Sequence, residues 1–256
     1  MKKSLFLSFL LSFSTLFAFA NNPQHVYVKI TTGKGEGIIR MYNETPLHRD
    51  NFVKLVREGY YEGLLFHRVI ENFMIQGGDP NSRDAESGQR LGSGGLDYKV
   101  PAEFMPHLFH KKGVLAAARD NNPEKASSST QFYLVQGRVF TDGGLDSLET
   151  LRLEGRKIPN NQREVYRTTG GVPHLDQNYT VYGEMVYGVS LIDSIAAVET
   201  DQFDRPLGDV QMHLSVLSRR ESINVERELR GLRSKNGLFI RFFDLFRSKE
   251  VELSKL

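Results

Sequence analysis

The chain has 256 residues, a length that suits one domain with extensions and leaves ample room for a buried core. Its formal net charge is +2 and no basic stripe stands out in the middle of the chain, which argues against nucleic-acid binding. There is no cysteine, which excludes disulfides, thiol nucleophiles and zinc sites built on cysteine.

The first 20 residues have the pattern of a secretory signal peptide. Lys2 and Lys3 precede an apolar run over residues 5–17, and Ala18-Phe19-Ala20 is a small-x-small cleavage site. We therefore expect cleavage after Ala20 and export to the periplasm or the medium. An uncleaved membrane anchor is the alternative, but the apolar run is shorter than the ~20 residues that span a bilayer.

Short strands are predicted through most of the remaining chain. Alternating or β-branched apolar residues mark strands at 25–32, 38–42, 113–118, 131–136, 179–186 and 210–217. Helices are expected after Thr45-Pro46 and after Thr141-Asp142, and a third around Leu191. Residues 81–95 and 157–172 have no hydrophobic period and are predicted to be loops. Many short strands without a βαβ rhythm indicate an antiparallel barrel or sandwich.

Residues 219–256 differ in character from the rest. They are dense in both charges and end in a run of aromatic and aliphatic residues from Leu238 to Phe246. We expect a helical C-terminal extension with one aromatic face. This face is expected either to pack on the preceding domain or to meet a partner or a membrane surface.

The stretch from Leu65 to Asp79 carries the most information. Two apolar runs flank Glu71-Asn72, which predicts a hairpin. Met74 and Gln76 are two residues apart and therefore share one face of their strand. Arg68 interrupts the first run. An arginine and a glutamine beside apolar side chains suit a binding surface better than a plain core.

This stretch also matches, without a gap, the signature F-H-R-[VI]-I-x-x-F-M-x-Q-G-G-D, and the chain resembles the cyclophilin-type peptidyl-prolyl cis-trans isomerases. Further pieces follow in the family's order at 92–95, 116–118 with 129–132, and 175–176 with 179–183. The resemblance implies a mainly β fold over residues 24–218: a closed antiparallel eight-stranded β-barrel capped by two helices. Residues of about 139–172 are an insertion relative to compact members. This insertion either shapes substrate access or is a solvated surface excursion.

The resemblance also assigns roles to residues. Arg68 and Gln76 would be catalytic: Arg68 donates a hydrogen bond to the proline nitrogen, and Gln76 holds the arginine and the substrate carbonyl. Ala118 and the backbone of Arg119 would receive the residues that precede proline, and Gln131 would lie beside them in the substrate-binding site. The walls of the proline pocket would be Phe73, Met74, Phe132 and Leu175, and the ring of Tyr179 would close the pocket. Three positions depart from the common pattern, with His174 in place of tryptophan, Arg119 in place of asparagine and Tyr179 in place of histidine.

Rotation about a peptide bond makes and breaks no covalent bond, so no cofactor or metal is implied. A metal pair of His107 and His110 lacks a third ligand at convincing spacing. We expect a monomer that acts on proline-containing peptides or unfolded proteins and assists the folding of exported proteins. The alternative is a proline-binding chaperone or interaction module with little turnover.

Overall fold

The computed structural model describes residues 22–232, which divide into two compact units. The larger unit spans residues 27–216, and the described residues on either side of it form the smaller unit. The predicted signal peptide and the aromatic residues from Leu238 to Phe246 lie outside the described residues. Among the helices of residues 22–232, none is long and apolar enough to cross a membrane.

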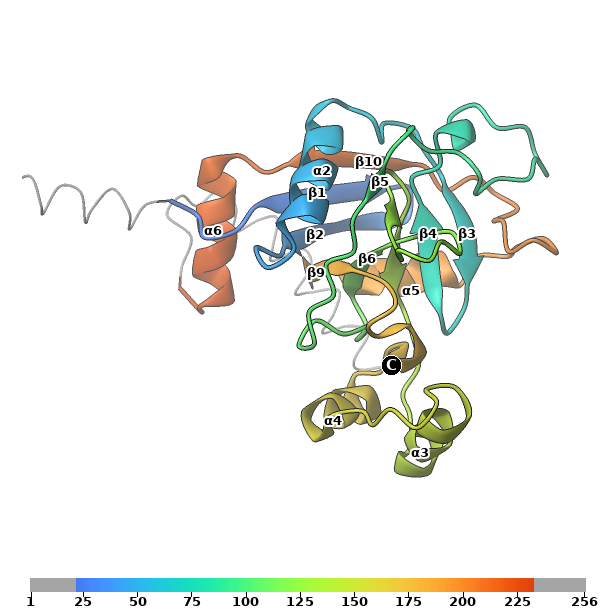
Figure 1. Ribbon diagram of the computed structural model, residues 1–256. Coiled ribbons are helices and arrows are strands. Elements are labelled where there is room, and N and C mark those ends of the chain that lie inside the picture. Colours follow the sequence, from blue (N-terminus) through green and yellow to red (C-terminus); the bar gives the residue numbers. More distant parts are fainter. Residues whose placement is uncertain (1–21, 233–256) are drawn as a thin grey trace, which may run out of the picture. The chain divides into compact units, whose positions relative to one another are not determined.

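The larger unit is built on an eight-stranded antiparallel sheet (Figure 1). Its strands lie in the order β10-β1-β2-β9-β6-β8-β4-β3, and each paired strand is antiparallel to its neighbour. Two short strands, β5 (Lys99–Val100) and β7 (Ser127–Ser128), pair separately. The eight strands are β1 (Tyr27–Thr32), β2 (Gly35–Met41), β3 (Phe66–Ile70), β4 (Met74–Gly77), β6 (Val114–Ala117), β8 (Phe132–Val135), β9 (Val181–Tyr187) and β10 (Met212–Val216).

The two edge strands of the sheet approach each other at one end. An isolated antiparallel bridge joins Leu65, just before β3, to Gln211, just before β10. The Phe66 N–H donates to the Val210 carbonyl at 2.9 Å. No longer ladder between β3 and β10 is seen in residues 22–232, so the expected closed barrel is not confirmed. The fold is mainly β, with a curled eight-stranded sheet.

Two helices contact the strands, as the resemblance implied. Helix α2 (Pro46–Arg57) packs against β9 and β10, and α5 (Ser190–Ala196) packs against β2, β3 and β4. Thr45 precedes α2 as predicted, but its side chain makes no capping hydrogen bond. Two short 3₁₀ turns, η1 (Pro80–Ser82) and η2 (Pro173–Leu175), shape the loops around the sheet.

The insertion folds into two helices that project together from the sheet (Figure 1). Helix α3 (Asp142–Leu151) begins after Thr141, whose hydroxyl accepts the Gly144 N–H. Helix α4 (Asn160–Thr168) lies where the sequence predicted a loop, so that prediction is wrong. The sequence of this helix shows no hydrophobic periodicity, because Gln162 and Tyr166 are the residues that it buries. A small core of its own joins the two helices, formed by Leu145, Leu153, Ile158 and Tyr166.

The smaller unit contains helix α6 (Arg219–Leu229), which occupies the first part of the predicted extension. Ser218 and Glu221 form a reciprocal capping box at its start. Within this unit, the Glu226 carboxylate accepts the backbone N–H of His25 at 3.0 Å. The N-terminal segment and the C-terminal helix are thus joined to each other.

Candidate active site

The candidate site lies on the hairpin of β3 and β4, which confirms the predicted hairpin. Asn72 in the turn has φ of 61°, a left-handed conformation that asparagine tolerates better than most residues. The register places Arg68 directly opposite Gln76. Directly opposed residues of an antiparallel pair project from the same face, so both side chains point to one surface.

Arg68 is held by a residue from a distant loop. Its Nε lies 3.4 Å from a carboxylate oxygen of Asp204, and the two side chains are 43% and 44% exposed. The Asp204 loop is itself fastened to β3, because the Asp204 carbonyl accepts the Val69 N–H at 2.8 Å. Asp204 is a site residue that sequence reasoning missed. No local pattern could have indicated it, since it lies 136 residues from Arg68.

Gln76 is held in turn by Gln131, which is buried. The Gln76 side-chain amide donates to the Gln131 side-chain carbonyl at 2.9 Å. The Gln131 amide donates to the Gly94 carbonyl at 2.7 Å and to the Gly92 carbonyl at 3.0 Å. Gln131 therefore ties the hairpin to the long loop after β4, and its polar groups are already used inside the protein.

The Gly-Gly-Asp end of the signature has a structural role. Gly78 has φ of 91°, and a Cβ there would lie 2.2 Å from the Thr130 carbonyl oxygen, so only glycine fits. The buried carboxylate of Asp79 accepts the backbone N–H groups of Gly92 and Gly94. These contacts hold the long loop beside Gln131.

An apolar cluster lies beside Arg68 and Gln76. Met74 and Tyr133 are buried in it with Val114 and Ala116 from β6. The partly buried residues packed against it include four that were predicted for the site: Phe73, Ala118, Leu175 and Tyr179. The structure thus brings together most of the predicted pocket.

Phe132 is not part of this cluster, so its prediction as a pocket wall is wrong. Its ring is fully buried on the other side of the sheet and packs edge-on against Phe52, Tyr61 and Phe66, with centroid distances of 5.3, 5.6 and 6.3 Å. Successive side chains of a strand point to opposite faces. Its neighbour Tyr133 therefore takes the place at the site.

The Tyr133 hydroxyl begins a buried polar chain. It lies 2.9 Å from His110 Nε2, and His110 Nδ1 lies 2.8 Å from a carboxylate oxygen of Asp176. The other Asp176 oxygen accepts the hydroxyl proton of Tyr166 at 2.6 Å. This chain joins the pocket to helix α4. Both ring nitrogens of His110 have hydrogen-bond partners in this chain. Residues 22–232 hold no group of three or more His, Cys, Asp or Glu residues that could hold a metal ion.

Arg119 stands at the edge of the site. Its guanidinium lies 4.7 Å from the centroid of the Tyr179 ring, and its Nε donates to the Asn178 carbonyl at 2.9 Å. The backbone N–H and carbonyl of Ala118 are bonded to Gln131 and Ser128. Those of Arg119 have no hydrogen bond within the described residues. They are therefore available to a bound peptide.

A groove of about 450 Å³ opens on this side of the cluster. Gln76, Ala118, Arg119 and Gln131 line it together with residues 92–99 of the long loop. On the other side, the rings of Phe73 and His174 stack, with centroids 5.7 Å apart and planes 17° apart. Burial, together with the charge of Arg152, lowers the pKa of His174 to about 4, so the ring is neutral at pH 7.

The curled antiparallel sheet thus places Arg68 and Gln76 beside an apolar cluster, and Gln76 also lines a groove of about 450 Å³. Residues 27–216 match the family described as cyclophilin type peptidyl-prolyl cis-trans isomerase/CLD. The chain belongs to the cyclophilin-type peptidyl-prolyl cis-trans isomerase family, and this is its enzyme class.

Relatives and solved structures agree with this assignment. A Staphylococcus aureus protein named for peptidyl-prolyl cis-trans isomerase activity is 32% identical over 216 residues, which cover 81% of this chain and 99% of the relative. A Streptococcus pyogenes protein named for both phosphatase and isomerase activity is 34% identical over 72% of this chain and 37% of its own length. The fold is similar to that of a Cryptosporidium parvum cyclophilin, with a TM-score of 0.56, 21% identity, and coverage of 76% of this chain and 98% of that chain. A structure of the same cyclophilin in the presence of the dipeptide Ala-Pro has a TM-score of 0.54, 20% identity, and coverage of 75% and 99%.

Proposed function

We propose that Arg68 is the catalytic group and that the substrate is an exposed X-Pro segment of a peptide or an unfolded protein. The observation that carries this proposal is the position of Arg68, opposite Gln76 and beside the apolar cluster around Met74 and Tyr133. An Ala-Pro dipeptide with a related cyclophilin adds support for the substrate class.

The chemistry requires a fixed hydrogen-bond donor on an apolar surface. Rotation about the bond faces a barrier of ~18–20 kcal/mol because it breaks amide resonance. In the twisted state the proline nitrogen regains its lone pair and accepts a hydrogen bond. Arg68 suits the donor role because its guanidinium is always charged and its planar fork has a fixed direction. The contact is made only in the twisted state, so it lowers the barrier.

The apolar cluster is proposed to hold the proline ring. A twisted amide is less polar than a planar one, so a dry apolar surrounding favours it over the ground state. Gln76 is proposed to orient the substrate carbonyl, and the free backbone groups of Arg119 to bind the residue before proline.

An isomerisation assay on a short Ala-Pro peptide tests this proposal. Arg68→Ala is expected to lower kcat/KM by roughly 10²-fold, the usual cost of removing a donor to the transition state. Arg57→Ala is the matched control, because Arg57 is an exposed arginine on α2 outside the site. Undiminished activity in Arg68→Ala would refute the catalytic role. Binding of the peptide without measurable turnover by the wild type would favour a proline-binding chaperone.

We also propose export, on the pattern of residues 1–20, and a role in the folding of exported proteins. Expression of the whole chain followed by cell fractionation and N-terminal mass spectrometry tests export. The expected product begins at Asn21 and is found in the periplasm or the medium. A cytoplasmic product with residues 1–20 intact would contradict the proposal.

A further inference from the structure

A second cavity, of about 470 Å³, lies between the β3–β4 turn and helix α3 of the insertion. Phe73 and His174 form one of its walls, and Leu148 and Leu151 of α3 form another. Leu151 is a large apolar side chain of α3, and it is 81% exposed to solvent. This cavity shares no lining residue with the groove beside Ala118.

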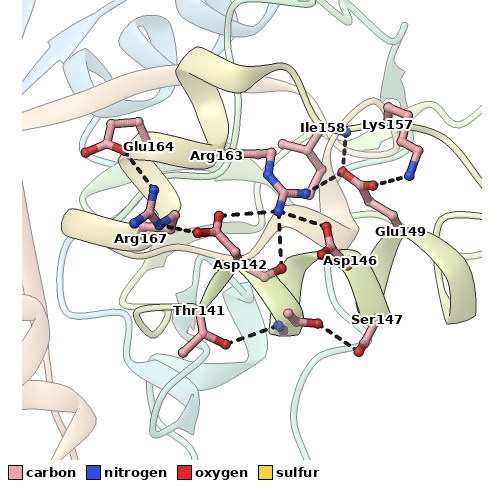
Figure 2. Close-up of polar contacts among 12 residues, drawn as sticks. Thr141, Asp142, Asp146, Ser147, Glu149, Lys157, Ile158, Arg163, Glu164 and Arg167 are labelled. Atoms are coloured by element: carbon pink, nitrogen blue, oxygen red, sulfur yellow. Dashed lines mark hydrogen bonds and ion pairs between the residues drawn. The ribbon is translucent and has the colours of Figure 1, made fainter.

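The face that α3 presents to the cavity is set by helical spacing. Gly144, Leu148 and Leu151 are separated by four and three residues, so they lie on one side of the helix. Its acidic residues lie on another side and are bound by Arg163 of α4, as Figure 2 shows. Their charges are therefore neutralised away from the cavity. No carboxylate lines the cavity within the described residues.

Two arginines give the cavity a positive charge. Arg138 and Arg152 are exposed and line it, and neither forms an ion pair with a carboxylate of residues 22–232. Both line the same cavity as His174, and their charges help to lower the pKa of its ring. The cavity thus combines the exposed Leu151 and the partly buried Leu148 with two arginines that have no carboxylate partner in the described residues. The guanidinium of Arg138 lies 5.1 Å from the centroid of the Phe140 ring.

Phe73 links the second cavity to the candidate active site. Phe73 packs against the apolar cluster and also lines the second cavity, where its ring stacks on His174. Ala118 packs against the same cluster but lines the other groove, where the residues before proline are proposed to bind. The cluster that is proposed to hold the proline ring is therefore in contact with residues of both the groove and the second cavity.

We propose that the insertion forms a second substrate subsite, which binds an apolar side chain followed by an acidic one in the segment after proline. Leu148 and Leu151 contact the apolar side chain, and Arg138 and Arg152 attract the carboxylate. This inference rests on the proposed function, because it concerns the same bound peptide. It identifies the preferred substrates as X-Pro segments with an apolar-acidic sequence on their C-terminal side.

Four peptides with blocked ends test the subsite. All begin Ala-Ala-Pro, and they continue with Ala-Ala, Leu-Glu, Leu-Lys or Ser-Glu. Dissociation constants from NMR titration and cis-trans exchange rates are measured for each at low and high salt. For the wild type, Leu-Glu is expected to bind about fivefold tighter than Leu-Lys, the size of an exposed ion pair, with less difference at high salt.

Two variants of α3 assign the contacts. Arg152→Glu is expected to abolish the preference for Leu-Glu over Leu-Lys. Leu151→Ser is expected to weaken both leucine peptides while leaving the Ser-Glu peptide unchanged. Arg57→Glu makes the same change in net charge at an exposed site on α2 and is expected to leave all four affinities unchanged. NMR spectra of each variant verify that α3 remains folded.

The possible failures are distinguishable. Equal affinity for Leu-Glu and Leu-Lys at low salt, or a preference that survives in Arg152→Glu, would overturn the subsite. Failure of the wild type to isomerise any peptide, including the Ala-Ala one, would overturn the proposed function. The affinity for each peptide is measured separately from its cis-trans exchange rate. The subsite is therefore tested even if the wild type isomerises no peptide.

Discussion

Asp204 holds the guanidinium of Arg68 from a loop 136 residues away, with 3.4 Å between Nε and a carboxylate oxygen. Both side chains are more than two-fifths exposed, so the pair contributes little to stability, at most about 1 kcal/mol. Its consequence is geometric: one nitrogen of the guanidinium is engaged by Asp204, and the other two have no hydrogen bond within residues 22–232. Asp204 is thus a positioning residue for the proposed catalytic group.

Asp204→Asn is expected to lower kcat/KM several-fold while changing the free energy of unfolding by no more than about 0.5 kcal/mol. The loss arises because Arg68 then samples more orientations. Isomerisation kinetics and urea denaturation measure the two effects. Asp84→Asn removes an equal charge from an exposed position outside the site and is the control. Equal kinetics in both variants would refute the positioning role.

A buried series of hydrogen bonds runs from Tyr133 at the pocket, through His110 and Asp176, to Tyr166 of α4, and supports the pocket wall. Tyr133→Phe keeps the ring but leaves His110 Nε2 buried without its hydrogen bond. We expect a loss of about 1–3 kcal/mol in the free energy of unfolding, the cost of an unsatisfied buried polar group. Tyr98→Phe, which removes an exposed hydroxyl, is the control and is expected to cost under about 0.5 kcal/mol. A Tyr133→Phe protein as stable as the wild type would show that this series of hydrogen bonds contributes nothing.

His67, the neighbour of the proposed catalytic residue Arg68, is expected to make the fold acid-sensitive. Burial lowers the pKa of His67 to about 4, from an ordinary value near 6.5. Between these values the unfolded chain binds a proton that the folded chain does not, so stability is lost as the pH falls. At pH 5 the loss is about 2 kcal/mol. His174, with its pKa also near 4, acts in the same direction.

Denaturant unfolding at pH 7, 6 and 5 measures this dependence. His67→Gln is expected to reduce its slope, while the exposed His107, substituted as His107→Gln, serves as the control. An unchanged slope in His67→Gln would mean that His67 has the same pKa in the folded and the unfolded state, which would contradict the prediction.

Glu149 is expected to hold the two insertion helices together. Its side chain is 3% exposed and binds Lys157 at 2.7 Å, Arg163 at 2.9 Å and the Ile158 N–H at 3.0 Å (Figure 2). The hydrogen bond from Lys157 is the main cause that lowers the pKa of Glu149 to about 2. Its stabilising effect is therefore present above about pH 4.5 and is lost as the pH falls toward 2.

Glu149→Gln is expected to speed hydrogen exchange in residues 142–168 by roughly tenfold, because the amide nitrogen of Gln cannot accept the hydrogen bonds that one carboxylate oxygen accepts, and the negative charge between Lys157 and Arg163 is lost. Exchange in the strands of the sheet is expected to stay unchanged. Glu164→Gln, which removes an exposed carboxylate from α4, is the control. Faster exchange throughout the chain would instead show that the insertion and the sheet unfold as one unit.

Much of the site could be predicted because it lies on one hairpin. The turn at Glu71-Asn72 and the two-residue period of a strand determine where Arg68 and Gln76 meet, and both are local properties of the sequence. The wrong prediction for Phe132 shows what the two-residue period of a strand cannot predict. Alternation separates Phe132 from Tyr133 but does not say which of them faces the site, because two large aromatic residues suit either side.

The sequence by itself determined the family, the positions of most strands along the chain and the hairpin that carries Arg68, because these depend on contiguous residues. Tertiary structure alone decided that Asp204 meets Arg68, that Tyr133 and not Phe132 lies at the pocket, and that α4 is a helix. Helix α4 depends on the contacts of Arg163 and Tyr166 with residues outside it. Such contacts join positions far apart in the chain, and no periodicity within a segment records them.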